Sequence, residues 1–567
     1  MRAVHGYRAW EPKLLEALRG YTRESLLCDL VAGVTVGLVA LPLAMAFGIA
    51  SGVTPEAGIY TAIAGGLIVS LLGGSRIQIA GPTGAFVVVV AGIIGQHGLS
   101  GLLMVTVMAG ALLVLLAVTG LGTAVRYIPR PIVIGFTNGI ALLIATTQVK
   151  DFLGLKMAEN PSEFFERMAA VGRALPTVDG TAMGLGVVSL ALILLTPRLA
   201  GRVPGTIVAL AVGTAAVAVF QLPVETIGSR FGGIRQGIPP LAIPEFRADL
   251  LLPLLPAALT VAILAAIESL LSAVVADTMS GDRHKPNVEL LAQGLANVAA
   301  PLVGGIPVTG AIARTATNHR SGARTPVAGV VHALTLLVVV LLFAPVAKFI
   351  PMATLAAVLF VVAYNMGEWR EAPAILRLDW AERSVWLITF VLTVVADLTI
   401  AVEVGMALAA LLYIQRISQT TTVSTVTKEY IARGVAHTLQ HKDIPPYVSI
   451  LRIHGPFLFG TTDQLEEETA DLTRFGAVVI LRLRNMTAID ATGIHALERL
   501  SDRLKRSKKA LLLCGARNQP SHFLKRADFR AHIGEANILP NVDAALERAR
   551  QLYEGSNVQE LRTGASG

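Results

Sequence analysis

Apolar stretches long enough to cross a lipid bilayer recur along most of this 567-residue chain, from residue 29 to residue 415. A membrane-spanning helix needs about 20 mostly apolar residues. Charged residues make up only 15% of the chain, whereas they make up about 25% of a typical soluble protein. The sequence therefore predicts an α-helical polytopic membrane protein rather than a large soluble core.

Hydropathy divides the apolar region into about fourteen segments, seven in each half. We predict the first seven at 29–49, 57–73, 82–95, 101–119, 131–149, 181–197 and 204–221. We predict the second seven at 252–276, 287–302, 309–319, 326–345, 351–366, 384–398 and 401–415. The third and tenth segments are too short to cross the bilayer alone.

These segments define the predicted domains. We expect an amphipathic cytoplasmic segment at 1–28, a first transmembrane repeat at 29–250, a second at 251–416, a linker at 417–441, a soluble domain at 442–555 and a disordered tail at 556–567. The N-terminal segment is basic and lacks the apolar core of a signal peptide, so we expect it to lie on the lipid surface.

The distribution of Lys and Arg predicts the orientation of the chain. Basic residues follow the even-numbered segments, as at Arg126, Arg198 and Arg320. A surplus of positive charge marks the cytoplasmic ends of spans, so both termini are predicted to be cytoplasmic. Because the net charge of +8 is spread over segment ends, it gives no reason to expect a nucleic-acid partner.

The two short segments carry similar motifs. "GPTG" at 81–84 opens the third segment, and "TGA" at 309–311 opens the tenth. Two halves with an odd number of spans face opposite ways, as in inverted-repeat transporters, whose broken helices mark the binding site. Two half-helix N-termini would then meet near mid-membrane, where free N–H groups attract an anion. The alternative is that these glycines only allow close helix packing.

The eighth segment contains a centrally placed acid. Glu268 has apolar residues on both sides, and Ser272 lies one helical turn further on the same face. Inserting such an acid at the centre of the bilayer costs about 2.5–3.5 kcal/mol of free energy, so its side chain normally faces a cavity or a partner. Burial favours its neutral form and hence proton carriage, while a carboxyl beside a hydroxyl also suits sodium. The alternative is a structural hydrogen bond between helices.

Arg314 lies about one turn inside the tenth segment. There it would add fixed positive charge to an anion pocket. The alternative is that its long side chain extends to the cytoplasmic surface, as we expect for Arg320. The sequence alone leaves both alternatives open.

The residues after the last span alternate between strand and helix patterns, which predicts a small α/β domain. Strands are expected at 447–455, 476–490 and 509–516, and helices at 462–475, 491–507 and 541–554. The domain has no phosphate-binding loop, dinucleotide-binding glycine pattern or metal-ligand spacing. We therefore expect a role in regulation or in binding a cytoplasmic partner rather than catalysis.

Three sequence motifs resemble one family, the SulP anion transporters, which are the bacterial members of solute carrier family 26. They are "AGVTVGLVALPLAMAFGIASG" in the first segment, "GPTGAFVV" in the third and a run from "AIESLL" to "TATN" across the eighth to tenth. The C-terminal domain resembles a STAS domain, with "DATG" at 490–493 matching that domain's Asp-Ser-Ser-Gly signature. The similarity extends over nearly the whole chain.

The resemblance implies fourteen spans in two inverted seven-helix repeats, arranged as core and gate domains, with a C-terminal cytoplasmic α/β STAS domain. It implies a homodimer, an elevator-like motion and an anion site between the third and tenth segments. The substrate-binding residues carried over are Phe47, Thr83, Gly84, Thr309, Gly310, Ala311 and Arg314, and the coupling residues are Glu268 and Ser272. No metal or organic cofactor is implied. Thr492 stands where the STAS signature has a phosphorylatable serine, so its phosphorylation is a hypothesis.

We therefore predict a secondary active anion transporter, not an enzyme, in a bacterial inner membrane. The predicted reaction is proton-coupled symport of an oxyanion or carboxylate, such as sulfate or a C4-dicarboxylate. Sodium-coupled bicarbonate carriers of this family tend to show Asp and Thr where this chain has Glu268 and Ser272. The alternatives are a sodium-coupled or uncoupled bicarbonate or chloride carrier, a nucleobase permease, and a membrane sensor that signals through its STAS domain.

Overall fold

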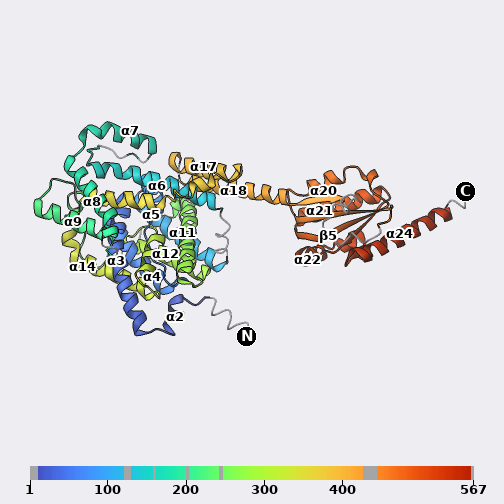
Figure 1. Cartoon of the computed structure of the whole chain (residues 1–567), viewed down its shortest axis with the longest axis horizontal. Coiled ribbons are helices and arrows are strands. Elements are labelled where there is room, and N and C mark those ends of the chain that lie inside the picture. The colour runs from blue at the N-terminus through green and yellow to red at the C-terminus, as the bar shows by residue number, and fades with distance from the viewer. Residues whose placement is uncertain are drawn as a thin grey trace. The chain divides into compact units, whose positions relative to one another are not determined.

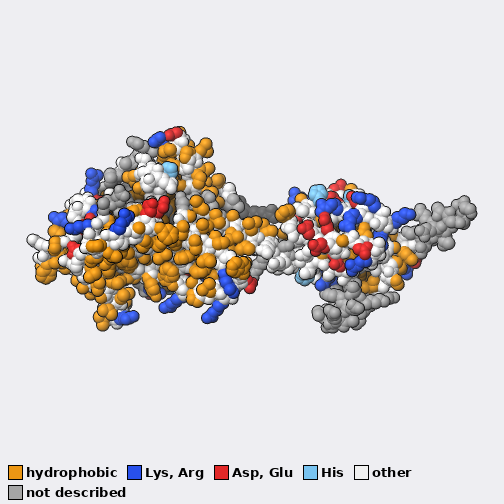
Figure 2. All heavy atoms as spheres, turned by 90° about the horizontal axis from the view of Figure 1, so that it is seen from above, with side chains coloured by type: hydrophobic (Ala, Val, Ile, Leu, Met, Phe, Trp, Pro, Cys, Tyr) orange, Lys and Arg blue, Asp and Glu red, His pale blue; other side chains and the backbone are white. Residues whose placement is uncertain are grey.

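The structure is a computed structural model of the chain. It describes residues 10–120, 129–157, 161, 163–199, 203–239, 241, 247–396, 398–425 and 444–563. The chain divides into two compact units, Met1–Ala409 and Ala410–Gly567. The first unit is helical, and hydrophobic side chains cover the face of it seen in Figure 2, whereas the second unit shows a mixed and highly charged surface.

The helices follow the predicted segments in order, except that one long helix takes the place of the third and fourth segments (Figure 1). The first half contains α3 (Arg23–Ala50), α4 (Pro55–Leu72), α5 (Ala85–Val118), α6 (Arg130–Leu153), α8 (Gly180–Leu199) and α9 (Gly205–Phe220). The second half contains α11 (Leu251–Ser280), α12 (Pro286–Ala299), α13 (Ile312–Arg320), α14 (Val327–Ala347), α15 (Met352–Met366), α17 (Trp380–Val395) and α18 (Leu398–Thr420). Among the described residues, 7 helices are long and apolar enough to cross a membrane.

Helix α5 accounts for both the third and the fourth predicted segments. It changes direction at Gly98, whose backbone has φ 68° and ψ −174°. No atom lies within 4 Å of the position that a Cβ at residue 98 would take. The left-handed backbone, rather than crowding, therefore favours glycine at this break.

The two halves pack on each other in a reciprocal way. The long helix α14 of the second half packs against α3 and α4 of the first half. Helix α5 of the first half packs in turn against α11 and α12 of the second half. Thus the fourth segment of each half contacts the first two segments of the other, as two interlocked inverted repeats require.

Two very short strands join the halves at the broken segments. Strand β1 (Ala80–Gly81) pairs antiparallel with β2 (Thr309–Gly310), with Ala80 opposite Gly310 and Gly81 opposite Thr309. All four residues are buried. Non-helical backbone inside a membrane protein must find hydrogen-bond partners within the protein, and this pairing supplies them immediately before α5 and α13 begin.

Asp29 connects the start of α3 to the loop before α14. Its Oδ1 accepts hydrogen bonds from the amides of Arg324 at 2.7 Å and Thr325 at 3.1 Å. Its Oδ2 accepts from the hydroxyls of Thr325 at 2.5 Å and Tyr21 at 3.0 Å. Asp29 is fully buried, so four donors compensate the cost of taking its carboxylate out of water.

The first span begins earlier than predicted. Helix α3 starts at Arg23 instead of residue 29, because the side chain of Thr22 caps it by accepting from the amide of Ser25. The predicted amphipathic segment contains the short helix α2 (Lys13–Leu18), and residues 1–9 lie outside the described residues. The Lys13 ammonium lies 2.9 Å from the carboxylate of Asp282, which follows α11.

The second unit contains a five-stranded sheet in the order β3-β4-β5-β6-β7. Its strands are β3 (Thr422–Thr425), β4 (Val448–Phe457), β5 (Val478–Ile489), β6 (Ala510–Cys514) and β7 (Ile538–Leu539); β3 is antiparallel to β4 and the other pairs are parallel. The helices that follow the strands are α20 (Asp463–Glu468), α21 (Ala491–Arg506), α22 (Asn518–Arg526), α23 (Phe529–Ile533) and α24 (Val542–Thr563). Apolar side chains on both faces of the sheet form separate clusters with these helices.

Two predicted boundaries need correction. The predicted linker at 417–441 includes the end of α18 and the short strand β3, which pairs with β4. The rest of that linker, 426–441, lies outside the described residues. The predicted disordered tail at 556–567 is helical as far as Thr563, because α24 continues through it.

Candidate functional site

A central cavity of about 410 Å³ lies where the two half-helices begin. Helices α3, α6, α11 and α15 complete its walls. Six of the predicted site residues line it: Phe47, Thr83, Gly84, Glu268, Ala311 and Arg314. Residues about 230 positions apart in the sequence thus surround a single space, because β1 and β2 pair immediately before the two half-helices.

The N-termini of α5 and α13 both face this cavity. Gly84 and Ala85 contribute the first turn of α5, and residues 311–314 contribute the first turn of α13. Amides in the first turn of a helix have no acceptor within the helix, and the helix dipole places partial positive charge there. Two such ends facing one cavity give it a positive backbone potential that favours an anion.

Glu268 supplies a carboxyl group to the same cavity. Its Oε2 accepts a hydrogen bond of 2.8 Å from the Thr83 hydroxyl. The bond joins α11 of the second half to the start of the broken segment in the first half. Glu268 can accept this hydrogen bond in either protonation state, because a protonated carboxyl keeps acceptor lone pairs.

Arg314 does not extend to the membrane surface. Its side chain is 2% exposed, and one guanidinium nitrogen donates to the carbonyl of Pro82. The second terminal nitrogen of the guanidinium group, Nη1, has no hydrogen-bond partner among the described residues. A Cβ at Gly81 would stand 2.6 Å from that nitrogen. The first half therefore makes room for Arg314 with a glycine, and the arginine brings fixed positive charge to the cavity wall.

Thr309, Gly310 and Ser272 lie behind the cavity instead of lining it. The Thr309 hydroxyl is 2.9 Å from that of Ser269, which also accepts from the Gly310 amide at 3.0 Å. The Ser272 hydroxyl lies 3.1 Å from the Thr315 hydroxyl. These residues hold β2 and α13 against α11, and their roles in binding and coupling stay predictions.

The sequence reasoning did not find the walls contributed by α6 and α15. These helices place Phe136, Thr137, Asn365 and Met366 at the cavity. Asn138, a buried polar residue in the largely apolar α6, was the sequence feature that could have pointed to this helix. Its amide nitrogen donates to the carbonyl of Gly367, and its oxygen accepts from the Trp386 indole at 3.0 Å, which ties α6 to the end of α15 and to α17.

Thr492 lies in the first turn of α21 in the second unit, and it is partly exposed. The helix is capped by Asp490, whose carboxylate accepts from the amides of Gly493 at 2.8 Å and Phe459 at 3.0 Å. A phosphate on the neighbouring hydroxyl would be stabilised by the helix dipole but repelled by Asp490. Phosphorylation of Thr492 therefore stays a hypothesis.

The fold and the cavity together define a class: a membrane transporter of two interlocked repeats with a site at their broken helices. Comparison with known families is more specific. Residues 26–389 match the sulfate permease family, and residues 439–545 match the STAS domain. The chain belongs to the sulfate permease (SulP) family of anion transporters and is not an enzyme.

Two curated relatives align over nearly their whole length. A putative sulfate transporter, YvdB, of Bacillus subtilis is 41% identical over 93% of this chain and 98% of its own. The bicarbonate transporter BicA of a Picosynechococcus species is 30% identical over 92% of this chain and 94% of its own.

Two solved structures share the fold. The inward-facing murine Solute Carrier 26 family member A9 anion transporter superposes with a TM-score of 0.85, covering 96% of this chain and 95% of that one at 18% identity. The transmembrane domain of a cyanobacterial BicA superposes with a TM-score of 0.61, covering 69% of this chain and 98% of that one at 31% identity.

Proposed function

We propose that this protein is a proton-coupled symporter of a small oxyanion or carboxylate, with sulfate and C4-dicarboxylates as the leading substrates. It acts in a bacterial inner membrane with both termini in the cytoplasm. The observation that carries the proposal is the hydrogen bond between Glu268 and Thr83 beside two helix N-termini and Arg314. Positive groups that hold an anion then share one cavity with a carboxyl that can take up a proton.

The proposed cycle begins with an anion at the first turns of α5 and α13, near Arg314. Glu268 binds a proton, which removes a negative charge that would repel the anion. The loaded core, made of α3, α4, the first part of α5 and their counterparts in the second half, then slides past α6 and α15. The protein works as a homodimer, and the STAS domain binds a cytoplasmic partner.

A sodium-coupled or uncoupled bicarbonate carrier is the second candidate. It is favoured by 30% identity to a bicarbonate transporter over 92% of this chain. The glutamate at 268 favours protons instead. A proton neutralises a buried carboxyl directly, whereas a sodium ion must first lose the water molecules that hydrate it. An uncoupled carrier of this kind would transport bicarbonate or chloride.

The test is uptake of labelled sulfate, succinate, bicarbonate and chloride into proteoliposomes with an imposed pH gradient or an imposed sodium gradient. We expect a pH gradient that is acidic outside the proteoliposomes to raise sulfate or succinate uptake about tenfold. A tenfold increase corresponds to about 1.4 kcal/mol of driving force. Sodium should have no effect. Bicarbonate uptake driven only by sodium would favour the second candidate. Absence of any flux, with a partner bound to the STAS domain, would favour a sensor.

A further inference from the structure

His332 is a buried histidine near the start of α14 that has no role in the proposed cycle. It is fully buried, and neither of its ring nitrogens has a hydrogen-bond partner in the described part of the chain. A neutral imidazole carries one donor and one acceptor, and buried polar atoms nearly always have a partner. Since no group of the described residues fills this role, we expect the ring to bind a water molecule.

The ring of His332 lies beside strand β1 and does not line the central cavity. Helix α14 packs on α4, and a Cβ at Gly66 of α4 would stand 3.5 Å from Nδ1 of His332. The same point is 3.2 Å from the carbonyl oxygen of Ala80 in β1. Because residue 66 is a glycine, it places no side chain between the ring nitrogen and this carbonyl. A water molecule between them can donate one hydrogen bond to each.

Arg314 approaches the same face of α4 one turn away. A Cβ at Gly81 would stand 2.6 Å from Nη1 of Arg314 and 3.3 Å from Cα of Ala62. Ala62 precedes Gly66 by one helical turn, so both lie on one face of α4. Neighbouring turns of a helix face are about 5–6 Å apart, and a water molecule with two hydrogen bonds of about 2.9 Å spans that distance. The charge of Arg314 accordingly acts on the His332 ring, and the two groups are close enough to share a water molecule.

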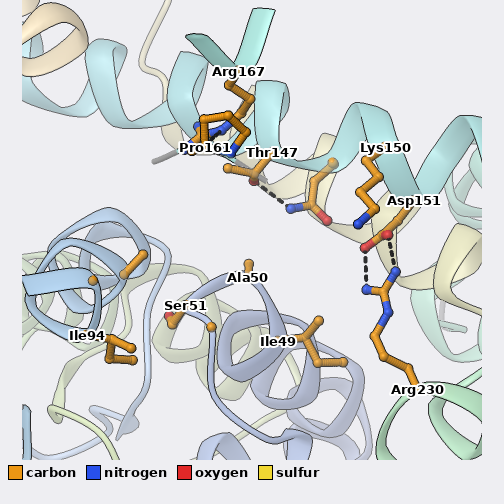
Figure 3. Close-up of a pocket in the computed structure, with 14 residues that line it drawn as sticks. Ile49, Ala50, Ser51, Ile94, Thr147, Lys150, Asp151, Pro161, Arg167 and Arg230 are labelled. Carbon is orange, nitrogen blue, oxygen red and sulfur yellow. Dashed lines mark hydrogen bonds and ion pairs between the residues drawn. The ribbon is translucent and has the colours of Figure 1, made fainter. Parts of the chain in front are cut away.

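Arg230 has the hydrogen-bond partners that Arg314 lacks. Its guanidinium group lines a second cavity, of about 380 Å³, and donates to both oxygens of Asp151 at 3.1 and 2.6 Å (Figure 3). Arg314 donates only to the carbonyl of Pro82 among the described residues. Two parallel hydrogen bonds fix the plane of a guanidinium group, whereas a group held through one nitrogen can still rotate. Arg314 therefore needs a second contact to keep a fixed position.

We propose that His332 is a positioning residue for Arg314: through Nδ1 it holds a buried water molecule that accepts a hydrogen bond from Nη1 and so fixes the guanidinium group at the wall of the central cavity. The inference rests on the proposed function, which gives Arg314 its role in binding the anion. The water molecule makes three hydrogen bonds, with Nη1, Nδ1 and the carbonyl of Ala80, and about three is the usual number for a buried water. It joins α13, α14 and β1, so that the charge of Arg314 keeps its direction toward the anion.

The test replaces His332 with Leu or with Asn. His332→Leu keeps a bulky side chain without a polar atom, whereas His332→Asn places an amide oxygen where Nδ1 stands. We expect His332→Leu to raise the Kd of labelled sulfate for the purified full chain about five- to tenfold, in the range expected when one hydrogen bond is lost. His332→Asn should stay within about twofold of the wild type, since it retains an acceptor for the water molecule.

Thr335→Val is the matched control on the same helix, because the Thr335 hydroxyl donates within α14 to the carbonyl of Val331 at 2.8 Å. Its Kd for sulfate should match that of the wild type. An unchanged Kd in His332→Leu, or an equal loss of affinity in His332→Asn, would overturn the proposal.

A double variant separates positioning of Arg314 from a merely structural role. If His332 acts through Arg314, His332→Leu should change the Kd less than about twofold in a chain that already carries Arg314→Gln, because the effects of coupled residues are not additive. The full five- to tenfold loss in that background would show that His332 supports the site independently of Arg314, and would overturn the proposal.

A spectrum recorded without anion distinguishes this inference from the proposed function. In the full chain with isotope-labelled arginine, the Nη resonances of Arg314, assigned from their loss in Arg314→Lys, should shift in His332→Leu and stay unchanged in His332→Asn and Thr335→Val. If the chain neither binds nor transports sulfate but the resonances follow this pattern, the positioning of Arg314 stands and the proposed function fails. If sulfate transport is normal and His332→Leu changes neither the resonances nor the Kd, the positioning fails and the proposed function stands.

Discussion

The Thr83 hydroxyl donates a 2.8 Å hydrogen bond to the Glu268 carboxylate and so links the first repeat to the second at the central cavity. The donor comes from the motif that opens the third segment, and the acceptor from the middle of α11. This contact ties the group that we propose to carry a proton to the backbone that we propose to hold the anion.

Removing this hydroxyl should impair coupling more than folding. We expect Thr83→Val to lower proton-driven uptake about tenfold, because a hydrogen bond to a charged group contributes about 1.5–3 kcal/mol. Thr83→Ser retains the donor and should stay within about twofold of the wild type, since only one methyl group is lost. Initial rates in proteoliposomes provide the measurement. Equal rates for the two variants would show that the hydroxyl has no role in transport.

Gly81 should not tolerate a side chain. Its φ of 153° is unfavourable for other residues, and a Cβ would stand 2.6 Å from Nη1 of Arg314. We expect Gly81→Ala to displace Arg314 and to reduce the affinity for the anion about tenfold or more. A tenfold reduction corresponds to the loss of one charge contact worth about 1.4 kcal/mol. The matched control is Gly92→Ala in α5, where no atom lies within 4 Å of the new methyl group. If both variants bind the anion like the wild type, Arg314 does not contribute to the site.

Asp29 is predicted to be a stability residue outside the transport chemistry. Asp29→Asn would replace an acceptor of four hydrogen bonds with a group that also donates, so one or two buried donors would lose their partner. We expect a loss of roughly 2–4 kcal/mol in the free energy of unfolding, seen as a lower thermal unfolding temperature in detergent. Asp379→Asn is the control, because Asp379 is exposed and makes no side-chain cap at the start of α17. Similar unfolding temperatures for both variants would contradict this role.

The two cysteines should differ in reactivity. Burial raises the pKa of the Cys514 thiol to about 11, while the nearby Arg482 acts in the opposite direction. Thiolates are the reactive form, so alkylation of the folded protein should label Cys28, which is partly exposed, and spare Cys514. Because the folded domain holds this proton more tightly than the unfolded chain, its stabilising contribution is present below about pH 9 and is lost as the pH rises toward 11. Mass spectrometry of labelled peptides is the check, and equal labelling of both residues would contradict the prediction.

The sequence predicted the membrane class, the order of the spans and the two broken segments, because apolar length and the "GPTG" and "TGA" motifs are strong local signals. It did not predict the pairing of β1 with β2, since two-residue strands leave no alternating pattern. The family resemblance correctly indicated two inverted repeats with a STAS domain.

The positions of individual side chains were harder to predict. Helical spacing puts Ser272 on the same face as Glu268, yet its hydroxyl lies beside that of Thr315 in a neighbouring half-helix. The helices α6 and α15 are apolar on most faces, so apart from Asn138 in α6 their sequences give little indication of which face meets the cavity. Contacts made by tertiary packing therefore decide which candidate residues line the site.

The proton-carrying role of Glu268 can be tested with one variant in two assays. Glu268→Gln keeps the size of the side chain and an acceptor for the Thr83 hydroxyl but cannot exchange a proton. In proteoliposomes we expect this variant to keep counterflow exchange of the labelled anion and to lose all acceleration by an imposed pH gradient. Full acceleration of uptake by the pH gradient in the Glu268→Gln variant would contradict the account.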